Sequence, residues 1–180
     1  SAVSLQALRV LVGYGYFAGQ KTFRSTMDRN TRTLEIMELS NFWRGKRVLI
    51  TGHTGFKGSW LSLWLNSIGA NVFGFAQSPD TSPSLFEQLG LSEKITHQIG
   101  DICNADEIYN FVKFSKPDVI FHLAAQPLVL RGYSETIPTW NSNVMGTVNL
   151  LQATRDLKHP CAIVAVTTDK VYSNIEAHHF

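Results

Sequence analysis

Three glycines recur at every third position in Thr-Gly-His-Thr-Gly-Phe-Lys-Gly, an octapeptide that directly follows an apolar run. Gly52 would permit a tight turn, Gly55 would let the backbone approach a pyrophosphate, and Gly58 would let the following helix pack closely. The N–H groups and the positive dipole end at the start of that helix favour phosphate, and Lys57 would add charge there. The loop therefore predicts a dinucleotide site, with a glycine-rich turn that binds nothing as its alternative.

The histidines do not suggest metal chemistry. His53 lies inside the glycine loop, and it is equally well interpreted as a surface turn residue or as a residue of the dinucleotide site. His122 ends an apolar segment, and we expect a core histidine with satisfied hydrogen bonds there rather than a catalyst. His178 and His179 are adjacent and near the end of the chain, so we expect them to be solvated. No histidine or cysteine pair has ligand spacing, so we predict no metal site.

Composition and charge exclude several classes of protein. With 44% hydrophobic and 17% charged residues among 180, the composition is that of a globular domain. No apolar stretch approaches the roughly 18 residues of a bilayer span. From Met37 onward, eleven Lys and Arg stand against twelve Asp and Glu, which offers no electrostatic footprint for nucleic acid. Two distant cysteines, Cys103 and Cys161, fit a reducing, cytoplasmic setting.

The first 36 residues differ from the rest of the chain. They carry five Lys and Arg against two Asp and Glu and show no regular apolar period. We expect residues 1–36 to be a leader or non-native extension, poorly ordered, with a domain from 37 to 180. A secretory signal is a weaker alternative, because only Arg9 precedes the apolar stretch.

After residue 44, strands and helices alternate quickly. We predict strands at 48–51, 71–76, 95–99, 118–123 and 162–167, and helices at 56–68, 85–89, 105–114 and 140–157, with a loop over 124–138. The apolar stripe of the last helix would comprise Val144, Val148, Leu150, Leu151 and Ala153. Such alternation predicts an α/β fold, a doubly wound parallel sheet of order 3-2-1-4-5. Its ligand site would lie beyond the carboxyl ends of strands 1 and 4.

The glycine spacing resembles that of the extended short-chain dehydrogenases/reductases. Gly100-Asp101-Ile102, His122-Leu123-Ala124-Ala125 and the segment 141–147 are similar to further motifs of that family. Over residues 41–174 the chain resembles the nucleotide-sugar 4,6-dehydratases, above all those that act on CDP-glucose. Segments 42–48, 52–60, 81–86, 122–129 and 167–170 carry this resemblance.

The resemblance implies a Rossmann-like domain that binds NAD. Carried over position by position, it implies cofactor contacts from Gly52, Thr54, Gly55, Phe56, Lys57, Gly58, Asp101, Ile102, Leu123, Ala124, Ala125 and Asn143. The preference for NAD over NADP rests on the resemblance alone, because Phe75-Ala76-Gln77-Ser78-Pro79 has no acid to grip the adenine ribose and Asp80 comes later. Gln126 and Arg131 are candidate contacts to the nucleotide sugar.

The implied chemistry is an internal redox cycle on the sugar. NAD takes hydride from C4, the ketone acidifies the C5 proton, water leaves from C6, and hydride returns to C6. Thr168 matches the hydroxyl residue at the C4 oxygen, and Asp169 matches the acid that helps the C6 hydroxyl leave. Lys170 falls where related enzymes carry a glutamate base, and a lysine serves as base only if its pKa is depressed. A polar turn is the alternative for this triplet.

Some features depart from the family pattern. The Tyr-x-x-x-Lys pair expected after the fifth strand is absent, and Tyr109 with Lys113 matches its spacing by chance in an earlier helix. We therefore expect a chain truncated after strand 5 and inactive on its own, from a protein that forms homodimers or homo-oligomers. Two alternatives stay open: another extended short-chain enzyme such as a sugar epimerase, and a non-catalytic NAD-binding module.

Overall fold

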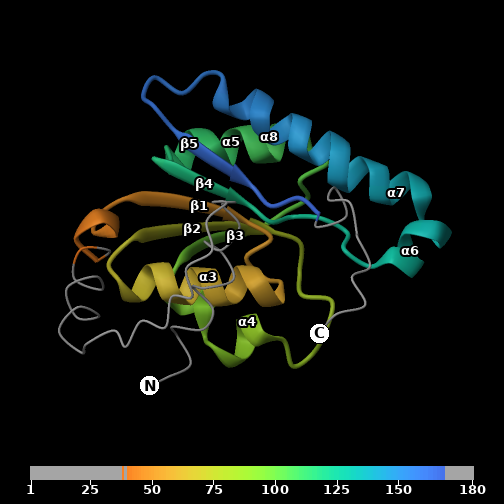
Figure 1. Ribbon diagram of the computed structural model, residues 1–180, viewed down its shortest axis with the longest axis horizontal. Coiled ribbons are helices and arrows are strands. Elements are labelled where there is room, and N and C mark those ends of the chain that lie inside the picture. The colour runs from red at the N-terminus through yellow and green to blue at the C-terminus, as the bar shows by residue number, and fades with distance from the viewer. Residues whose placement is uncertain (1–37, 39, 169–180) are drawn as a thin grey trace, which may run out of the picture. The chain divides into compact units, whose positions relative to one another are not determined.

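The computed structural model describes Glu38 and residues 40–168 of the chain (Figure 1). The leader predicted over 1–36 lies outside the described residues, as do Asp169 and Lys170. The chain divides into two compact units, Ser1–Phe42 and Trp43–Phe180, and the second contains every strand described below.

Five parallel strands form one sheet, ordered β3-β2-β1-β4-β5. They are β1 (Arg47–Thr51), β2 (Asn71–Ala76), β3 (Thr96–Ile99), β4 (Val119–His122) and β5 (Ala162–Ala165). The predicted fold class and strand order are therefore confirmed. The order reverses between β1 and β4, whose last residues Thr51 and His122 are register partners. Ligands of such sheets bind outside the carboxyl ends of the strands at this switch point.

Helices cover both faces of the sheet (Figure 1). They are α3 (Phe56–Ser67), α4 (Leu85–Gln88), the 3₁₀ turn η1 (Leu91–Glu93), α5 (Ala105–Ser115), α6 (Val129–Ser134), α7 (Thr136–Trp140), the π-helical turn η2 (Asn141–Met145) and α8 (Gly146–Thr154). In Figure 1, α3 lies on one face, and α5 and α8 lie side by side on the other. Alternate strand residues supply the two cores, because successive side chains point to opposite faces.

The two cores are separate clusters of buried apolar side chains. The α5 and α8 side is built around Leu49, Phe75, Ile108, Ile120 and Leu150. The α3 side is built from Val48, Ile50, Leu61, Leu65, Ala70, Val72 and Ile95. Since both faces of β1 are buried, its run of apolar residues shows no alternation with polar ones, as is usual for a central parallel strand.

The segment after β4 differs from the prediction. The loop expected over 124–138 holds two short helices, α6 and α7. Gly132 and Pro138 are typical of loops, yet Pro138 falls in the first turn of α7, where a missing N–H costs little. The single helix expected over 140–157 begins instead as the π-helical turn η2 and continues as α8 to Thr154.

The apolar stripe predicted for that helix splits between two faces. Leu150 and Ala153 are buried against α5 and the sheet, but Val144, Val148 and Leu151 are exposed. The prediction was wrong for these three residues because the period of 3.6 does not say which apolar flank of a helix meets the core. Among the described residues, no helix combines the length and apolar character needed to cross a membrane.

Candidate functional site

The glycine loop connects β1 to α3 at the switch point of the sheet. Gly52 has φ +77°, in the left-handed region that favours glycine, and its N–H donates to the carbonyl of Phe75 at 2.9 Å. A Cβ built on Gly52 would lie 2.9 Å from the backbone N of Ala124 and from the carbonyl carbon of Leu123. The loop therefore touches both the end of β2 and the segment that follows β4.

Gly58 and Gly55 play different structural roles. A Cβ on Gly58 would stand 2.0 Å from the carbonyl oxygen of Gly52, so α3 packs directly on the turn. Gly55 has an ordinary φ of −75° and is exposed, and of the atoms in the described part of the chain a Cβ there would meet only the Gly52 oxygen, at 3.4 Å. The backbone at Gly55 therefore faces open space, as a ligand that approaches the loop requires.

The N-terminus of α3 has no side-chain cap from the residues that the structure describes. Its N-cap is Gly55, and no acidic residue lies in its first turn. Phe56 is 71% exposed, and Lys57 is exposed beside it. Uncapped N–H donors, the positive end of the dipole and an adjacent cation suit an anion such as the pyrophosphate of a dinucleotide. The residues of the loop therefore fit the predicted cofactor.

The two remaining residues of the loop point inward. The Thr54 hydroxyl donates to the carbonyl of Gln77 at 2.9 Å, which ties the loop to the segment after β2. His53 is fully buried, so its interpretation as a surface turn residue was wrong. Its ring lies 5.3 Å from those of both Phe86 and His97. Among the described residues, neither ring nitrogen has a partner at good hydrogen-bond geometry. Burial, with the nearby His97, lowers the pKa of His53 to about 4.

The segment after β3 contributes Asp101 and Ile102. The Asp101 carboxylate accepts from the N–H of Cys103 at 2.8 Å, and the Asp101 N–H donates to Glu107 at 3.2 Å. The Ile102 side chain is buried, and a Cβ on Gly146 would lie 2.6 Å from it. Ile102 can thus offer a ligand its backbone only, because its side chain belongs to the core.

The segment after β4 is held by Asn143 from η2. The Asn143 side chain accepts from the N–H of Gln126 at 2.7 Å and donates to the Gln126 carbonyl at 3.1 Å. Gln126 also uses its own carboxamide within the segment, accepting from Leu128 N–H and donating to the Leu128 carbonyl and the Thr139 hydroxyl. The amide proposed for substrate contact is therefore engaged in holding its own loop. Ala124 lies beside Gly52 of the glycine turn, and neither Ala124 nor Ala125 has a bulky side chain.

Arg131 lies on α6 and is ion-paired. Its guanidinium contacts Glu135 at 2.9 Å and Asp80 at 3.9 Å, and the Glu135 pair raises the pKa of Arg131. Asp80 belongs to the segment after β2, so this contact connects the segments that follow β2 and β4. The pairs are exposed and contribute little to stability.

Of the predicted catalytic residues, the structure describes Thr168 alone. It is exposed and follows β5, beyond the same edge of the sheet as the glycine loop. Asp169 and Lys170 lie outside the described residues. No group of three or more metal-ligating side chains is found within the described part of the chain.

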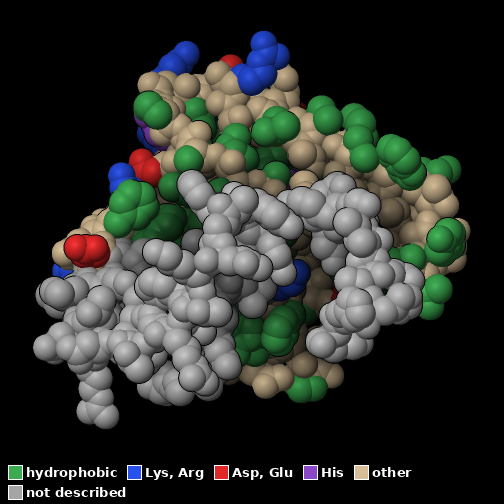
Figure 2. Space-filling view, in the orientation of Figure 1, with side chains coloured by type: hydrophobic (Ala, Val, Ile, Leu, Met, Phe, Trp, Pro, Cys, Tyr) green, Lys and Arg blue, Asp and Glu red, His purple; other side chains and the backbone are tan. Residues whose placement is uncertain are grey.

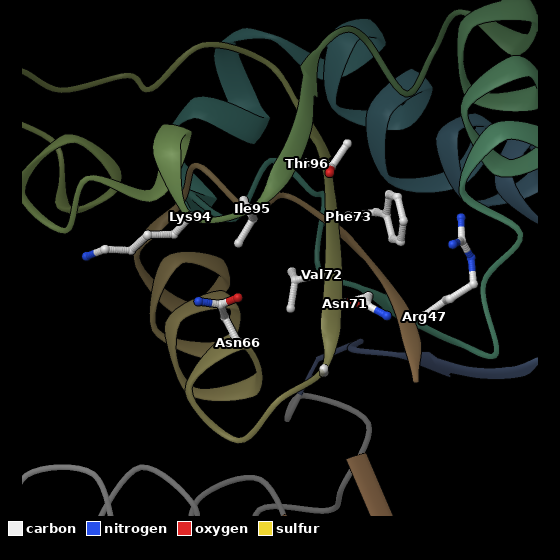
Figure 3. Close-up of a pocket in the computed structure, with 9 residues that line it drawn as sticks. Arg47, Asn66, Asn71, Val72, Phe73, Lys94, Ile95 and Thr96 are labelled. Carbon is white, nitrogen blue, oxygen red and sulfur yellow. The ribbon is translucent and has the colours of Figure 1, made fainter. Parts of the chain in front are cut away.

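A hollow of about 330 Å³ lies at the amino ends of β1, β2 and β3, away from the carboxyl ends where the glycine loop lies (Figure 3). Arg47, Asn71 and Thr96, which line it, are the first residues of β1, β2 and β3. The Arg47 guanidinium stacks 4.5 Å from the Phe73 ring and donates to the Ser115 carbonyl, while the Lys94 ammonium donates to a backbone carbonyl. These cations are engaged by the protein, and the hollow is separate from the glycine loop.

The hydrogen bonds of His122 to two threonines were not predicted from the sequence. Thr51 Oγ1 lies 2.7 Å from His122 Nδ1, and His122 Nε2 lies 2.9 Å from Thr147 Oγ1. The expectation that His122 is a core histidine with satisfied hydrogen bonds is confirmed, and burial lowers its pKa. Hydroxyl residues at the end of β1 and in α8 were the available signal. The register of β1 and β4 brings Thr51 to the ring, and the position of α8 brings Thr147 there.

Comparisons with known proteins agree with this geometry. The family model described as GDP-mannose 4,6 dehydratase matches residues 49–180. The chain is 50% identical over 136 residues to CDP-glucose 4,6-dehydratase of Salmonella typhimurium, a match that covers 76% of this chain but 38% of that protein.

Solved structures share the fold over a similar stretch. The epimerase Mth375 of Methanothermobacter thermautotrophicus superposes with a TM-score of 0.61 at 27% identity, covering 72% of this chain and 37% of that one. UDP-glucose-4-epimerase of Stenotrophomonas maltophila, solved with bound NAD, gives 0.65 at 23% identity, covering 74% and 40%. The chain thus spans about two fifths of the length of these relatives. Because the family model matches well over half of its residues, the chain belongs to the GDP-mannose 4,6-dehydratase family.

Proposed function

We propose that this chain is the NAD-binding part of a nucleotide-sugar 4,6-dehydratase whose substrate is CDP-glucose. The observation that carries the proposal is the uncapped, glycine-lined N-terminus of α3, open to solvent at the switch point of the sheet. Substrate and reaction are assigned on the 50% identity to the Salmonella typhimurium enzyme and on the match of Thr168-Asp169-Lys170 to the family's catalytic segment.

In this proposal each loop has its own task. The N–H groups at the start of α3, with Lys57, bind the pyrophosphate, and Thr54 holds the loop in place through Gln77. Asp101 and the backbone of Ile102 border the adenine, while Leu123, Ala124 and Ala125 let the cofactor pass close to the chain. Asn143 keeps this last segment in position through Gln126.

Bound NAD would supply the hydride acceptor for sugar C4 and the hydride donor for C6. The chain's own groups would move the protons. Thr168 would hydrogen-bond the C4 oxygen, Asp169 would protonate the departing C6 hydroxyl, and Lys170 is the candidate for removing the C5 proton. Arg131 remains a candidate for the nucleotide sugar, although its pairing with Glu135 must then be exchanged for the ligand.

The first test is calorimetric titration of the chain with NAD and, separately, with NADP. We expect NAD to bind more tightly than NADP, and we expect Lys57→Ala to weaken NAD binding without altering thermal unfolding, because Lys57 is exposed. Lys113→Ala, an exposed lysine on α5, is the matched control. Failure of both dinucleotides to bind would contradict the proposal.

A sugar epimerase is the second candidate, favoured by the likeness to the epimerase Mth375 at 27% identity. An epimerase does not expel the C6 hydroxyl of its sugar and so needs no acid at Asp169. In the whole protein, Asp169→Asn would abolish dehydration of CDP-glucose, whereas it would leave an epimerisation intact. Proton NMR of the sugar distinguishes the two products, since only dehydration replaces the C6 hydroxymethyl group by a methyl group.

Self-association is also part of the proposal. Exposed apolar residues follow one another at steps of three or four along the continuous helical run of α7, η2 and α8: Ile137, Trp140, Val144, Val148 and Leu151. Figure 2 shows hydrophobic side chains along the edge where these helices lie. We call these five residues the apolar stripe. Such spacing suits packing against another helix, and we assign the same stripe of a second copy as the partner.

A cytoplasmic location completes the proposal. Both cysteines of the chain, Cys103 and Cys161, are free, as expected in a reducing compartment.

A further inference from the structure

The ring of His122 lies between two threonine hydroxyls at the centre of the switch point. His122 is the last residue of β4 and is 5% exposed. Its Nδ1 is 2.7 Å from the hydroxyl of Thr51 at the end of β1, and its Nε2 is 2.9 Å from the hydroxyl of Thr147 in α8. Both distances are those of hydrogen bonds, so each contact needs one donor and one acceptor.

The contact at Thr147 fixes which nitrogen carries the proton. The Thr147 hydroxyl donates to the backbone carbonyl of Asn143 at 2.8 Å. A hydroxyl has a single hydrogen, so the Thr147 oxygen can only accept from the imidazole. Nε2 of His122 must therefore be the protonated nitrogen.

The contact at Thr51 leads to the same assignment independently. The Thr51 oxygen accepts from the N–H of Ala124 at 3.2 Å, and its own hydrogen is left to point at His122 Nδ1. A neutral imidazole protonated on Nε2 presents a bare, accepting Nδ1. All four hydrogen bonds then run in one direction, from Ala124 through Thr51, His122 and Thr147 to Asn143.

The other protonation states of His122 would break this series of four hydrogen bonds. With the proton on Nδ1, the hydrogen of the fully buried Thr51 would lose its acceptor, and Thr147 would have to release the Asn143 carbonyl. A doubly protonated ring would also leave the Thr51 hydrogen unpaired. An unpaired buried donor is unfavourable, because it loses its hydrogen bonds to water and gains none in the protein. Burial of the ring lowers the pKa of His122, which favours the neutral form as well.

We propose that His122, neutral and protonated on Nε2, is a positioning residue that ties η2 to the carboxyl ends of β1 and β4. Through Thr147 it holds the turn that carries Asn143, whose carboxamide grips both backbone groups of Gln126. Through Thr51 it holds Ala124, which lies against Gly52. The ring thereby sets the spacing between the glycine loop and the segment after β4. The consequence for NAD rests on the proposed function, whereas the hydrogen-bond chain does not.

The tautomer is measured by ¹⁵N NMR of the ring nitrogens in the full chain without ligand. We expect the His122 signals to show a protonated Nε2 and an unprotonated Nδ1. A ring protonated on Nδ1 would overturn the proposal. This measurement needs no variant and no cofactor.

The positioning role is tested by three threonine variants. Thr147→Val removes the hydroxyl at nearly constant volume, Thr147→Ser retains it, and Thr154→Val is the matched control, because Thr154 donates to the Leu151 carbonyl in the same helix without a histidine partner. We expect Thr147→Val to speed hydrogen exchange of the Gln126 amide about tenfold, with a similar loss of NAD affinity. Thr147→Ser and Thr154→Val should resemble the unmodified chain.

Each outcome bears on one proposal only. Unchanged Gln126 exchange in Thr147→Val, or an equal effect of Thr154→Val, would overturn the positioning role of His122. If the unmodified chain binds neither dinucleotide, the proposed function fails, while the tautomer and the exchange rates still decide the role of His122. If Thr147→Val does not fold, the ring nitrogens of the unmodified chain decide: a protonated Nε2 supports the proposal, and a protonated Nδ1 overturns it.

Discussion

Gly58 on the first turn of α3 sits directly against the carbonyl of Gly52 in the glycine turn. A Cβ at Gly58 would lie 2.0 Å from the oxygen and 2.7 Å from the carbonyl carbon of Gly52. The obstacle is backbone, which cannot swing aside as a flexible side chain would. The third glycine of the loop is therefore required by packing, while the second, Gly55, faces open space.

Gly58→Ala should consequently destabilise the domain. We expect the free energy of unfolding to fall by about 3 kcal/mol, because overpacking against a fixed backbone forces α3 away from β1. Urea unfolding followed by circular dichroism measures this. An alanine variant as stable as the unmodified chain would show that α3 and the turn are less closely packed than described.

Gly55→Ala separates ligand binding from packing at the same loop. Its φ of −75° suits alanine, and the nearest atom to a new Cβ is 3.4 Å away, so stability should change by no more than about 1 kcal/mol. The methyl group would stand where the pyrophosphate is proposed to approach. We expect NAD affinity to fall at least about tenfold, roughly 1.4 kcal/mol, in calorimetric titration. An unchanged NAD affinity would show that the pyrophosphate does not bind beside Gly55.

The stability of the domain should depend on pH through His53. Its pKa is about 4 in the folded chain and 6.5 as the ordinary value, so between these pH values the unfolded chain binds more protons than the folded one. The contribution of neutral His53 to the free energy of unfolding is therefore fully present above pH 6.5. It is lost as the pH falls towards 4, and the loss is about 3 kcal/mol.

Urea unfolding at several pH values between 4 and 7 checks this dependence. His53→Leu should flatten the curve over this range, even if it lowers stability at neutral pH. His159→Gln, which alters a histidine outside the cluster of His53, His97 and Phe86, should retain the slope. Equal slopes in the unmodified chain and His53→Leu would contradict the assignment.

Asn143→Asp should loosen the segment after β4. A carboxylate still accepts from the Gln126 N–H but cannot donate to the Gln126 carbonyl, and the two oxygens repel each other. We expect a loss of about 1–3 kcal/mol in unfolding free energy. Asn110→Asp makes the same chemical change at an exposed position of α5 and should have little effect. Comparable losses in both variants would argue against a specific role for Asn143.

Ile137→Asp should weaken self-association through the apolar stripe. Ile137 is 75% exposed, so the change should cost the monomer little stability while placing a charge within the proposed interface. Sedimentation velocity at increasing concentration should show dimers for the unmodified chain and a shift of at least about tenfold in the dissociation constant for the variant.

The control lies on β3, the edge strand farthest from β5 in the sheet. Ile99→Glu, on β3, changes an apolar residue that is 47% exposed and should leave association unchanged. If the unmodified chain remains monomeric throughout the concentration range, the apolar stripe is excluded as a dimer interface.

Much of the fold follows from local patterns. The strands at 48–51 and 71–76 are short apolar runs bounded by glycine or polar residues, and β1 and β2 occupy almost these ranges. The strand–glycine–helix order around Gly52 also implies a parallel sheet and the position of its switch point. By contrast, α6 and α7 were missed, because Gly132 and Pro138 suggest a loop when their place within a helical turn is not known.

The sequence by itself determined the sheet, its order and the glycine loop, because these depend on the period of apolar residues and on glycines at fixed spacing. Only the tertiary structure decided how polar side chains are used. It buried His53 beside His97, engaged the Gln126 carboxamide within its own loop, and placed His122 between Thr51 and Thr147. These contacts join residues from different strands and helices, and side-chain environment at such distances depends on strand register and helix packing rather than on neighbours along the chain.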